Sequence, residues 1–148
     1  MKRMILSIFA IPLLLACSNK SESPKISLEK VDNPGMEVVN GKHMFDNAFT
    51  NKINSIYYIG DDSCSSCQAL KPKVQEWCVN NNARVYEIVL TEMTPEDIIY
   101  IQDSTVGYYV WKDEDVVPTV YFFMEGEVVT RTSGDNTIKY LNKYVEVK

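Results

Sequence analysis

The sequence predicts a single α/β domain in which helices flank a small central β-sheet. Three segments rich in apolar residues, 53–59, 84–90 and 119–124, have the length and composition of strands. Helical patterns separate them, and a turn at Gly126 joins the third segment to a return strand at 127–132. The predicted order is helix, strand, helix, strand, helix, strand, strand and helix, which is typical of an α/β sandwich.

The first sixteen residues are predicted to form a signal peptide that is not part of the fold. Lys2 and Arg3 precede an apolar run at 5–15 that is too short to span a bilayer as a stable helix. The run ends at Ala16-Cys17, which resembles a bacterial lipobox. This resemblance implies cleavage before Cys17, lipidation of Cys17 and attachment to the outer face of a membrane. The alternative is an ordinary secretory signal with a chance cysteine.

The mature chain is acidic and long enough for one domain. Removing residues 1–16 leaves 148 − 16 = 132 residues, of which 17–31 are predicted to be a flexible tether and 32–148 the domain. Because Lys2 and Arg3 are lost, 15 − 2 = 13 basic residues face 20 acidic ones, a net charge of −7. This charge argues against nucleic acid as a partner and against charge-driven binding to anionic lipid. Membrane attachment would therefore depend on the lipid anchor.

The smaller elements follow from turn residues and apolar spacing. A short strand is predicted at 36–39 and a short amphipathic helix at 43–51. Thr94 and Pro95 mark the start of a later helix, and a closing helix is predicted at 135–145. Segment 104–115 is the hardest to place. Its aromatic run, Tyr108 to Trp111, is predicted to pack in the core, with a substrate groove as the alternative.

Cys64 and Cys67 form a Cys-x-x-Cys pair at the start of a helix predicted to extend to about residue 79. Asp62 or Ser63 is expected to cap this helix. In a first helical turn, unpaired N–H groups and the helix dipole lower the pKa of a thiol. We therefore predict that Cys64 is the catalytic nucleophile and that Cys67 resolves the mixed disulfide.

Half of a zinc site has the same cysteine spacing, so metal binding is an alternative. The single histidine, His43, lies far upstream, and Cys78 lies eleven residues beyond Cys67, or about 16 Å along a helix. We predict no metal site and no cofactor, a surface position for His43, and a buried structural role for Cys78.

Several motifs together resemble the thioredoxin-fold family. Cys64 and Cys67 are followed by Pro72 five residues later, and Val117-Pro118 before a strand resembles the cis-proline motif of that family. Segment 123–129 resembles the hairpin that follows this motif, and Gly134 before the last helix also fits.

The resemblance covers about residues 53–145 and implies a three-layer sandwich with a mixed central sheet. It also implies that Pro118 is cis beside the cysteine pair, and that Val117 and Pro118 bind an extended segment of substrate. The alternative for Pro118 is a trans proline that starts a strand.

Some positions depart from the family pattern. Ser65-Ser66 replaces the Gly-Pro pair of cytosolic thioredoxins, and Tyr58 stands where the family carries a buried acid, so its proton relay is not expected. Asp61 and Asp62 would oppose thiolate formation. Lys71 and Lys73 are expected to be ordinary exposed lysines, with a raised local positive potential as the alternative.

The chain resembles secreted or lipidated bacterial thioredoxin-like proteins, including the bacteriocin transport accessory type. The expected function is a membrane-tethered, extracytoplasmic thiol–disulfide oxidoreductase of the bacterial cell envelope. Its partners would be a protein or peptide client with a thiol or disulfide, and a membrane redox partner that resets the cysteine pair. The alternative is a binding or accessory module for an exported protein or peptide, with Cys64–Cys67 as a structural disulfide.

Overall fold

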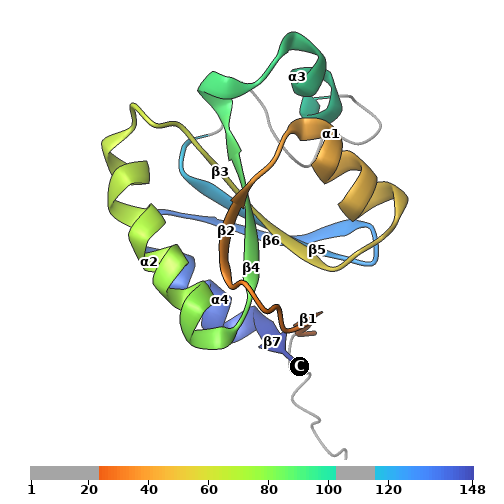
Figure 1. The fold of residues 1–148 in the computed structure, drawn as a ribbon, viewed down its shortest axis with the longest axis vertical. Coiled ribbons are helices and arrows are strands. Elements are labelled where there is room, and N and C mark those ends of the chain that lie inside the picture. Colours follow the sequence, from red (N-terminus) through yellow and green to blue (C-terminus); the bar gives the residue numbers. More distant parts are fainter. Residues whose placement is uncertain (1–23, 103–115) are drawn as a thin grey trace, which may run out of the picture.

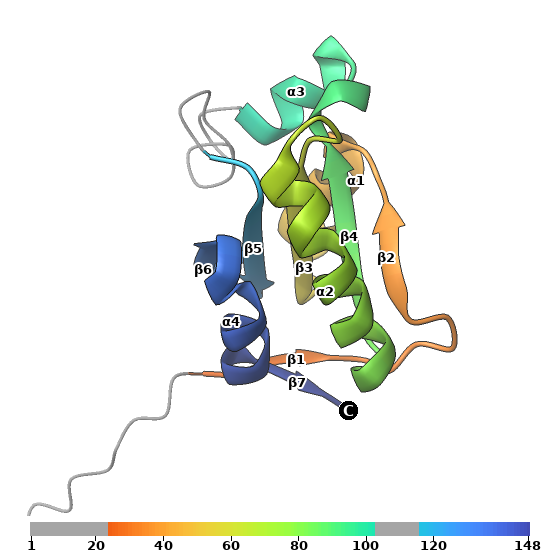
Figure 2. The same ribbon diagram turned by 90° about the vertical axis from the view of Figure 1, so that its left-hand side faces the viewer.

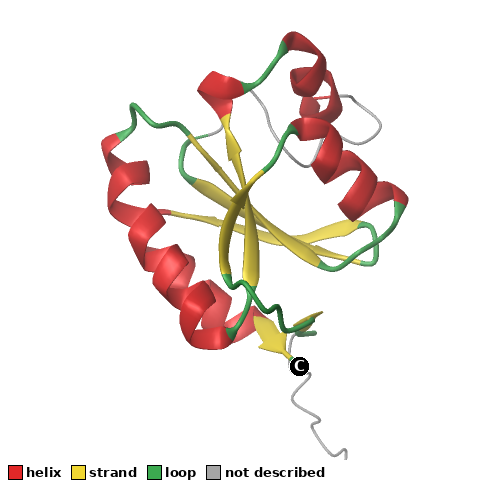
Figure 3. Ribbon diagram, in the orientation of Figure 1, coloured by secondary structure: helices red, strands yellow, loops and turns green. Residues whose placement is uncertain are grey.

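The computed structural model describes residues 24–102 and 116–148. In this part of the chain a five-stranded sheet has the order β2-β4-β3-β5-β6, and helices cover both of its faces (Figures 1 and 3). β4 is parallel to both β2 and β3, whereas β5 is antiparallel to β3 and β6 is antiparallel to β5. The strands are β2 (Gly35–Val38), β3 (Ser55–Gly60), β4 (Arg84–Val89), β5 (Thr119–Met124) and β6 (Glu127–Ser133).

The helices form two outer layers. α1 packs with α3 on one face of the sheet, and α2 packs with α4 on the other. Each face has its own buried apolar cluster, so the predicted three-layer α/β sandwich with a mixed central sheet is confirmed. The helices are α1 (Gly41–Met44), which continues as a π-helix over Phe45–Thr50, α2 (Ser65–Asn81), α3 (Pro95–Gln102) and α4 (Thr137–Tyr144).

β3 is buried along its whole length because it lies between β4 and β5. Successive side chains of a strand point to opposite faces. Tyr58 therefore packs in the cluster under α2 and α4, whereas Tyr57 packs in the cluster under α1 and α3. The strand predicted at 53–59 begins two residues later, at Ser55, and the side chain of Ile53 is 49% exposed.

A second, two-stranded sheet lies at the end of the domain where β3 begins (Figure 2). In it β1 (Ile26–Leu28) pairs in parallel with β7 (Val145–Val147). The backbone N–H of Lys148 donates to the Leu28 carbonyl at 3.0 Å. The Asn54 side chain, just before β3, donates to the Ser27 carbonyl at 3.2 Å. We call this part of the molecule the β1–β7 end.

The β1–β7 sheet corrects two predictions from the sequence. The prediction of a flexible tether at 17–31 is wrong for Ile26–Leu28, while residues 17–23 lie outside the described residues. Ile26 is fully buried, and it packs in the same cluster as Leu141 and Val145. A strand of three residues after a polar segment is too short to show a hydrophobic period. The helix predicted at 135–145 ends at Tyr144, and Val145 begins β7.

The other predicted elements are present, with small shifts in their bounds. The helix predicted at 43–51 begins at Gly41, because the Asn40 side chain caps it by accepting from the N–H of His43 at 2.9 Å. α3 begins at Pro95 as predicted, and the Thr94 hydroxyl accepts from the Asp97 N–H at 3.2 Å. Within 24–102 and 116–148, every helix is too short or too polar to cross a bilayer.

Candidate active site

The cysteine pair lies where β3 ends and α2 begins, which we call the cysteine end of the domain. Cys64 is the N-cap of α2, and its sulfur accepts a hydrogen bond from the backbone N–H of Cys67 at 3.2 Å. The prediction that Asp62 or Ser63 caps this helix is wrong. The carboxylate of Asp61 accepts from the Ser63 N–H at 2.7 Å and from the Ser63 hydroxyl at 2.6 Å, so this turn places Cys64 at the cap.

The environment of Cys64 favours its thiolate. A hydrogen bond from the Cys67 thiol, followed by bonds from the backbone N–H groups of Cys67 and Ser66, lowers the pKa of Cys64 below its ordinary value. The helix dipole acts in the same direction, because Cys64 lies at the N-terminus of a helix of seventeen residues. Cys64 is partly exposed, so a disulfide from outside can approach its sulfur.

Cys67 has the opposite properties. Its side chain is only 4% exposed, and burial raises the pKa of its thiol to about 11. Tyr58 in β3 donates its hydroxyl to the Cys67 carbonyl at 3.1 Å, which ties the first turn of α2 to the centre of the sheet. One cysteine of the pair is therefore accessible and easily ionised, while the other is sheltered and protonated.

Val117 and Pro118 lie beside Cys64, as the resemblance to the thioredoxin-fold family implies. The Val117–Pro118 peptide bond is cis, and the Cys64 thiol donates to the Val117 carbonyl at 3.7 Å. Pro118 is buried, Val117 is partly exposed and Val116 is 65% exposed. Substrate binding by Val117 and Pro118 stays a prediction.

Glu87 is a site residue that the analysis of the sequence missed. It lies in β4 directly opposite Tyr58 of β3, and it is 3% exposed. Its carboxylate forms an ion pair with Lys71 of α2 at 2.7 Å. The sequence pattern that indicates it is a glutamate inside the apolar segment 84–90, because a charged residue buried in a strand needs a partner.

A small cavity of about 30 Å³ lies between Glu87 and Cys67, both of which line it. A water molecule needs roughly 10–15 Å³ of such space, so the cavity has room for one. The cavity is lined by Tyr58, Asp61, Asp62, Cys67, Gln68, Lys71 and Glu87.

The other candidate residues lie away from this arrangement. Cys78 is fully buried, and burial raises the pKa of its thiol to about 11, in agreement with a structural role. His43 is half-buried on the opposite face of the sheet, where its ring lies 4.7 Å from that of Tyr86. Cys17 and the aromatic run from Tyr108 to Trp111 lie outside the described residues.

The two lysines near the pair are both ion-paired. Lys71 pairs with Glu87, and the ammonium of Lys73 lies 3.8 Å from the Asp135 carboxylate. Their positive charges are therefore offset by carboxylates. Among residues 24–102 and 116–148, no group of three or more metal-binding side chains comes together.

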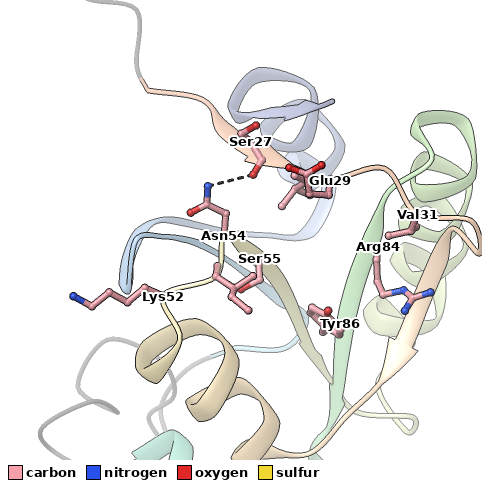
Figure 4. Close-up of a pocket in the computed structure, with 10 residues that line it drawn as sticks. Ser27, Glu29, Val31, Lys52, Asn54, Ser55, Arg84 and Tyr86 are labelled. Atoms are coloured by element: carbon pink, nitrogen blue, oxygen red, sulfur yellow. Dashed lines mark hydrogen bonds between the residues drawn. The ribbon is translucent and has the colours of Figure 1, made fainter.

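A larger pocket, of about 400 Å³, lies at the β1–β7 end and not beside the cysteines (Figure 4). Its lining includes Ser27 in β1 and Glu29 just after it, Lys52 and Asn54 before β3, and Arg84 at the start of β4. The backbone carbonyl of Ser27 and the side chain of Asn54 are hydrogen-bonded to each other, and Arg84 is paired with Glu37 at 2.6 Å. The Ser27 carbonyl, the Asn54 side chain and the Arg84 guanidinium are thus engaged within the chain.

Comparison with solved structures identifies the fold. Thioredoxin O1 from Arabidopsis thaliana is 18% identical, with 73% of this chain and 93% of that chain covered and a TM-score of 0.53. A mutant thioredoxin from Halobacterium salinarum is 24% identical, with 77% and 94% covered and a TM-score of 0.54. The thioredoxin NaTrxh from Nicotiana alata is 16% identical, with 85% and 98% covered and a TM-score of 0.52.

No family model matches the chain, and no curated protein matches it. The likeness to thioredoxins is therefore one of structure. The chain has a thioredoxin-like α/β fold with a Cys-x-x-Cys pair at the start of the helix that follows the central strand.

Proposed function

We propose that the protein is a thiol–disulfide oxidoreductase that uses Cys64 and Cys67. The observation that carries this proposal is the asymmetry of the pair. Cys64 is accessible, with a lowered pKa, whereas Cys67 is sheltered, and its backbone N–H lies 3.2 Å from the Cys64 sulfur. A nucleophile and a resolving thiol need these two environments.

In the reducing direction, the Cys64 thiolate attacks one sulfur of a client disulfide. A mixed disulfide forms, and the other client sulfur leaves as a thiolate that takes a proton from water. Cys67 then loses its proton and attacks the Cys64 sulfur, so that the Cys64–Cys67 disulfide forms and the second client thiolate leaves. The client gains two electrons and this chain loses two. The oxidising direction is the reverse of the same steps.

The second step needs a proton acceptor, because the pKa of Cys67 is about 11. Glu87 lines the same small cavity as Cys67 and is a carboxylate held inside the protein. We assign it as the acceptor, reached from Cys67 through a water molecule for which the cavity has room. Lys71, at 2.7 Å, supplies the counter-charge that a buried carboxylate requires.

We place this activity in the bacterial cell envelope, outside the cytosol, with the chain held on a membrane by a lipid on Cys17. The support is the apolar run at 5–15, the Ala16-Cys17 junction and the polar residues after it. The resemblance to secreted or lipidated bacterial thioredoxin-like proteins, including the bacteriocin transport accessory type, agrees with this location. Disulfides persist in such compartments, so a protein or peptide client and a membrane redox partner are expected there.

Trapping of the mixed disulfide tests the proposed activity. In a Cys67→Ser variant the first step proceeds and the second cannot, so client proteins should accumulate as covalent adducts. The adducts are measured on non-reducing gels and should disappear on addition of dithiothreitol. A matched Cys78→Ser variant, which keeps the pair, should form none.

Two results would contradict the proposal that the protein is a thiol–disulfide oxidoreductase. One is a Cys67→Ser variant that traps no client, and the other is a native Cys64–Cys67 bridge that exchanges slowly with thiol buffers. Both together would favour the binding or accessory module with a structural disulfide.

A further inference from the structure

Tyr58 brings a buried hydroxyl from the central strand to the cysteine pair. It lies in β3, its side chain is 1% exposed, and its ring packs in the cluster under α2 and α4. Burial raises the pKa of Tyr58 far above its ordinary value, so the hydroxyl keeps its proton at every pH at which the protein works. Tyr58 therefore acts as a hydrogen-bond donor and not as a base.

Gly60 leaves the space that the Tyr58 ring occupies. The two residues are two positions apart in β3, so they face the same side of the sheet. A Cβ atom at Gly60 would lie 2.6 Å from Cε1 of the Tyr58 ring. That is far inside the separation of about 3.5–4.0 Å at which carbon atoms attract each other. The missing side chain thus lets the ring lean over Gly60 toward α2, where its hydroxyl meets Cys67.

The Tyr58 hydroxyl lies near both the carbonyl and the thiol of Cys67. It donates to the carbonyl at 3.1 Å, and both residues line the small cavity between Cys67 and Glu87. Burial raises the pKa of the Cys67 thiol to about 11, and hydrogen bonding to Tyr58 opposes part of that rise. The hydroxyl can therefore serve either acceptor group of Cys67.

We propose that Tyr58 stabilises the Cys67 thiolate in the resolving step by turning its O–H from the Cys67 carbonyl to the Cys67 sulfur. This inference rests on the thiol–disulfide exchange of the proposed function and adds a residue to its second step. The proton of Cys67 passes through water to Glu87, and Tyr58 keeps its own. The electron pair left on the Cys67 sulfur then attacks the Cys64 sulfur, and the bond from Cys64 to the client breaks as the client thiolate leaves.

The turn of the hydroxyl is favourable because the acceptor becomes charged. A hydrogen bond to an ionised group is roughly twice as strong as one between neutral groups. The Cys67 carbonyl remains bonded after the turn, since a carbonyl inside an α-helix accepts from the N–H four residues later. A thiolate that is 4% exposed has lost most of its water and needs such a donor. Glu87 and Tyr58 therefore have different tasks, because one accepts the proton and the other stabilises the charge that remains.

Tyr58→Phe in the full chain tests this role, because it removes the hydroxyl and keeps the ring. Stopped-flow measurement with a fluorescent disulfide peptide separates attack by Cys64 from release of the client by Cys67. We expect release to slow by about tenfold, the loss of one hydrogen bond to a charged group, and attack to stay native. The factor should be constant from about pH 6 to pH 9, since both proteins stay below the pKa of Cys67. The loss in Glu87→Gln should instead narrow as pH rises.

Tyr57→Phe is the matched control. Tyr57 is the neighbouring residue in β3 and is also fully buried, and its hydroxyl accepts from the Asn47 amide at 3.1 Å. It packs on the opposite face of the sheet, so its loss should leave both steps native. Gly60→Ala is a second variant, in which the added Cβ displaces the Tyr58 ring, and it should slow release more than attack.

A folded Tyr58→Phe with native release would overturn the role of Tyr58 alone. Equal slowing of both steps, or the same slowing in Tyr57→Phe, would do so too, because either result is what a general loss of packing produces. If Tyr58→Phe does not fold, Gly60→Ala decides by the same criteria. A native protein that forms no mixed disulfide with the peptide would overturn the oxidoreductase itself, which trapping with Cys67→Ser judges separately.

Discussion

The two ends of β3 differ in what they contribute to the molecule. The cysteine end has a partly exposed thiol, a helix N-terminus and a buried ion pair, and its residues are arranged by hydrogen bonds. The β1–β7 end is joined by apolar burial, with Ile26 fully buried and Leu28 and Val145 nearly so. The reactive cysteine and the buried apolar contacts of β1 and β7 thus lie at opposite ends of β3. Substitutions at the cysteine end should mainly affect activity, and substitutions at the β1–β7 end should mainly affect stability.

The largest expected effect is that of Cys64→Ser at the cysteine end. We expect it to lower the rate of dithiothreitol-driven reduction of a protein disulfide by about 10³-fold or more, because exchange requires the thiolate. Stability should change little, since serine is a favourable N-cap and Cys64 occupies the cap of α2. The same assay on Cys78→Ser should give the native rate, and a comparable loss there would contradict the assignment of the nucleophile.

At the β1–β7 end we expect a loss of stability with little change in activity. Ile26→Ala should lower the free energy of unfolding by about 2–5 kcal/mol, because it removes a fully buried side chain. The matched variant Ile53→Ala should change it by no more than about 0.5–1 kcal/mol, since Ile53 is 49% exposed. Urea denaturation of the reduced protein measures both.

The alkylation rate of Cys64 at neutral pH should be native in Ile26→Ala. A large change in that rate would mean that the two ends are coupled, and the separation of chemistry from packing would then be wrong.

A smaller effect is expected for Glu87→Gln, which keeps the shape of the side chain and removes its charge. The release of client by Cys67 should slow by about 10–100-fold at neutral pH, because the proton acceptor is lost. As pH rises toward the Cys67 pKa of about 11, hydroxide takes over this role, and the rate should approach that of the native protein. Attack by Cys64 on the client should be unchanged.

Stopped-flow measurement with a fluorescent disulfide peptide separates these two steps. Glu92→Gln, at an exposed position nearby, is the matched control and should behave as native. Equal slowing of both steps in Glu87→Gln would point to a structural role for the Glu87–Lys71 pair in place of proton transfer.

Local sequence determined much of this protein because its strongest patterns are short-range. The apolar strands, the cysteine spacing, the Thr94-Pro95 helix start and the turn at Gly126 each depend on residues within one element. These patterns predict the α/β sandwich, and the resemblance to the thioredoxin-fold family adds that Val117 and Pro118 lie beside the cysteine pair; the structure has Cys64 in contact with both Val117 and Cys67. Residues 103–115 lie outside the described residues, so the aromatic run there stays a prediction.

Only the tertiary structure decided the remaining features, because they depend on contacts between residues far apart in the chain. Glu87 belongs to the site because the β3–β4 register sets it opposite Tyr58 and because Lys71 of α2 reaches it. Ile26–Leu28 forms a strand because the chain returns with β7 and offers it a partner and a core. A strand of only three residues that follows a polar segment has no such preference by itself, since its stability comes from burial and pairing that exist only in the folded domain.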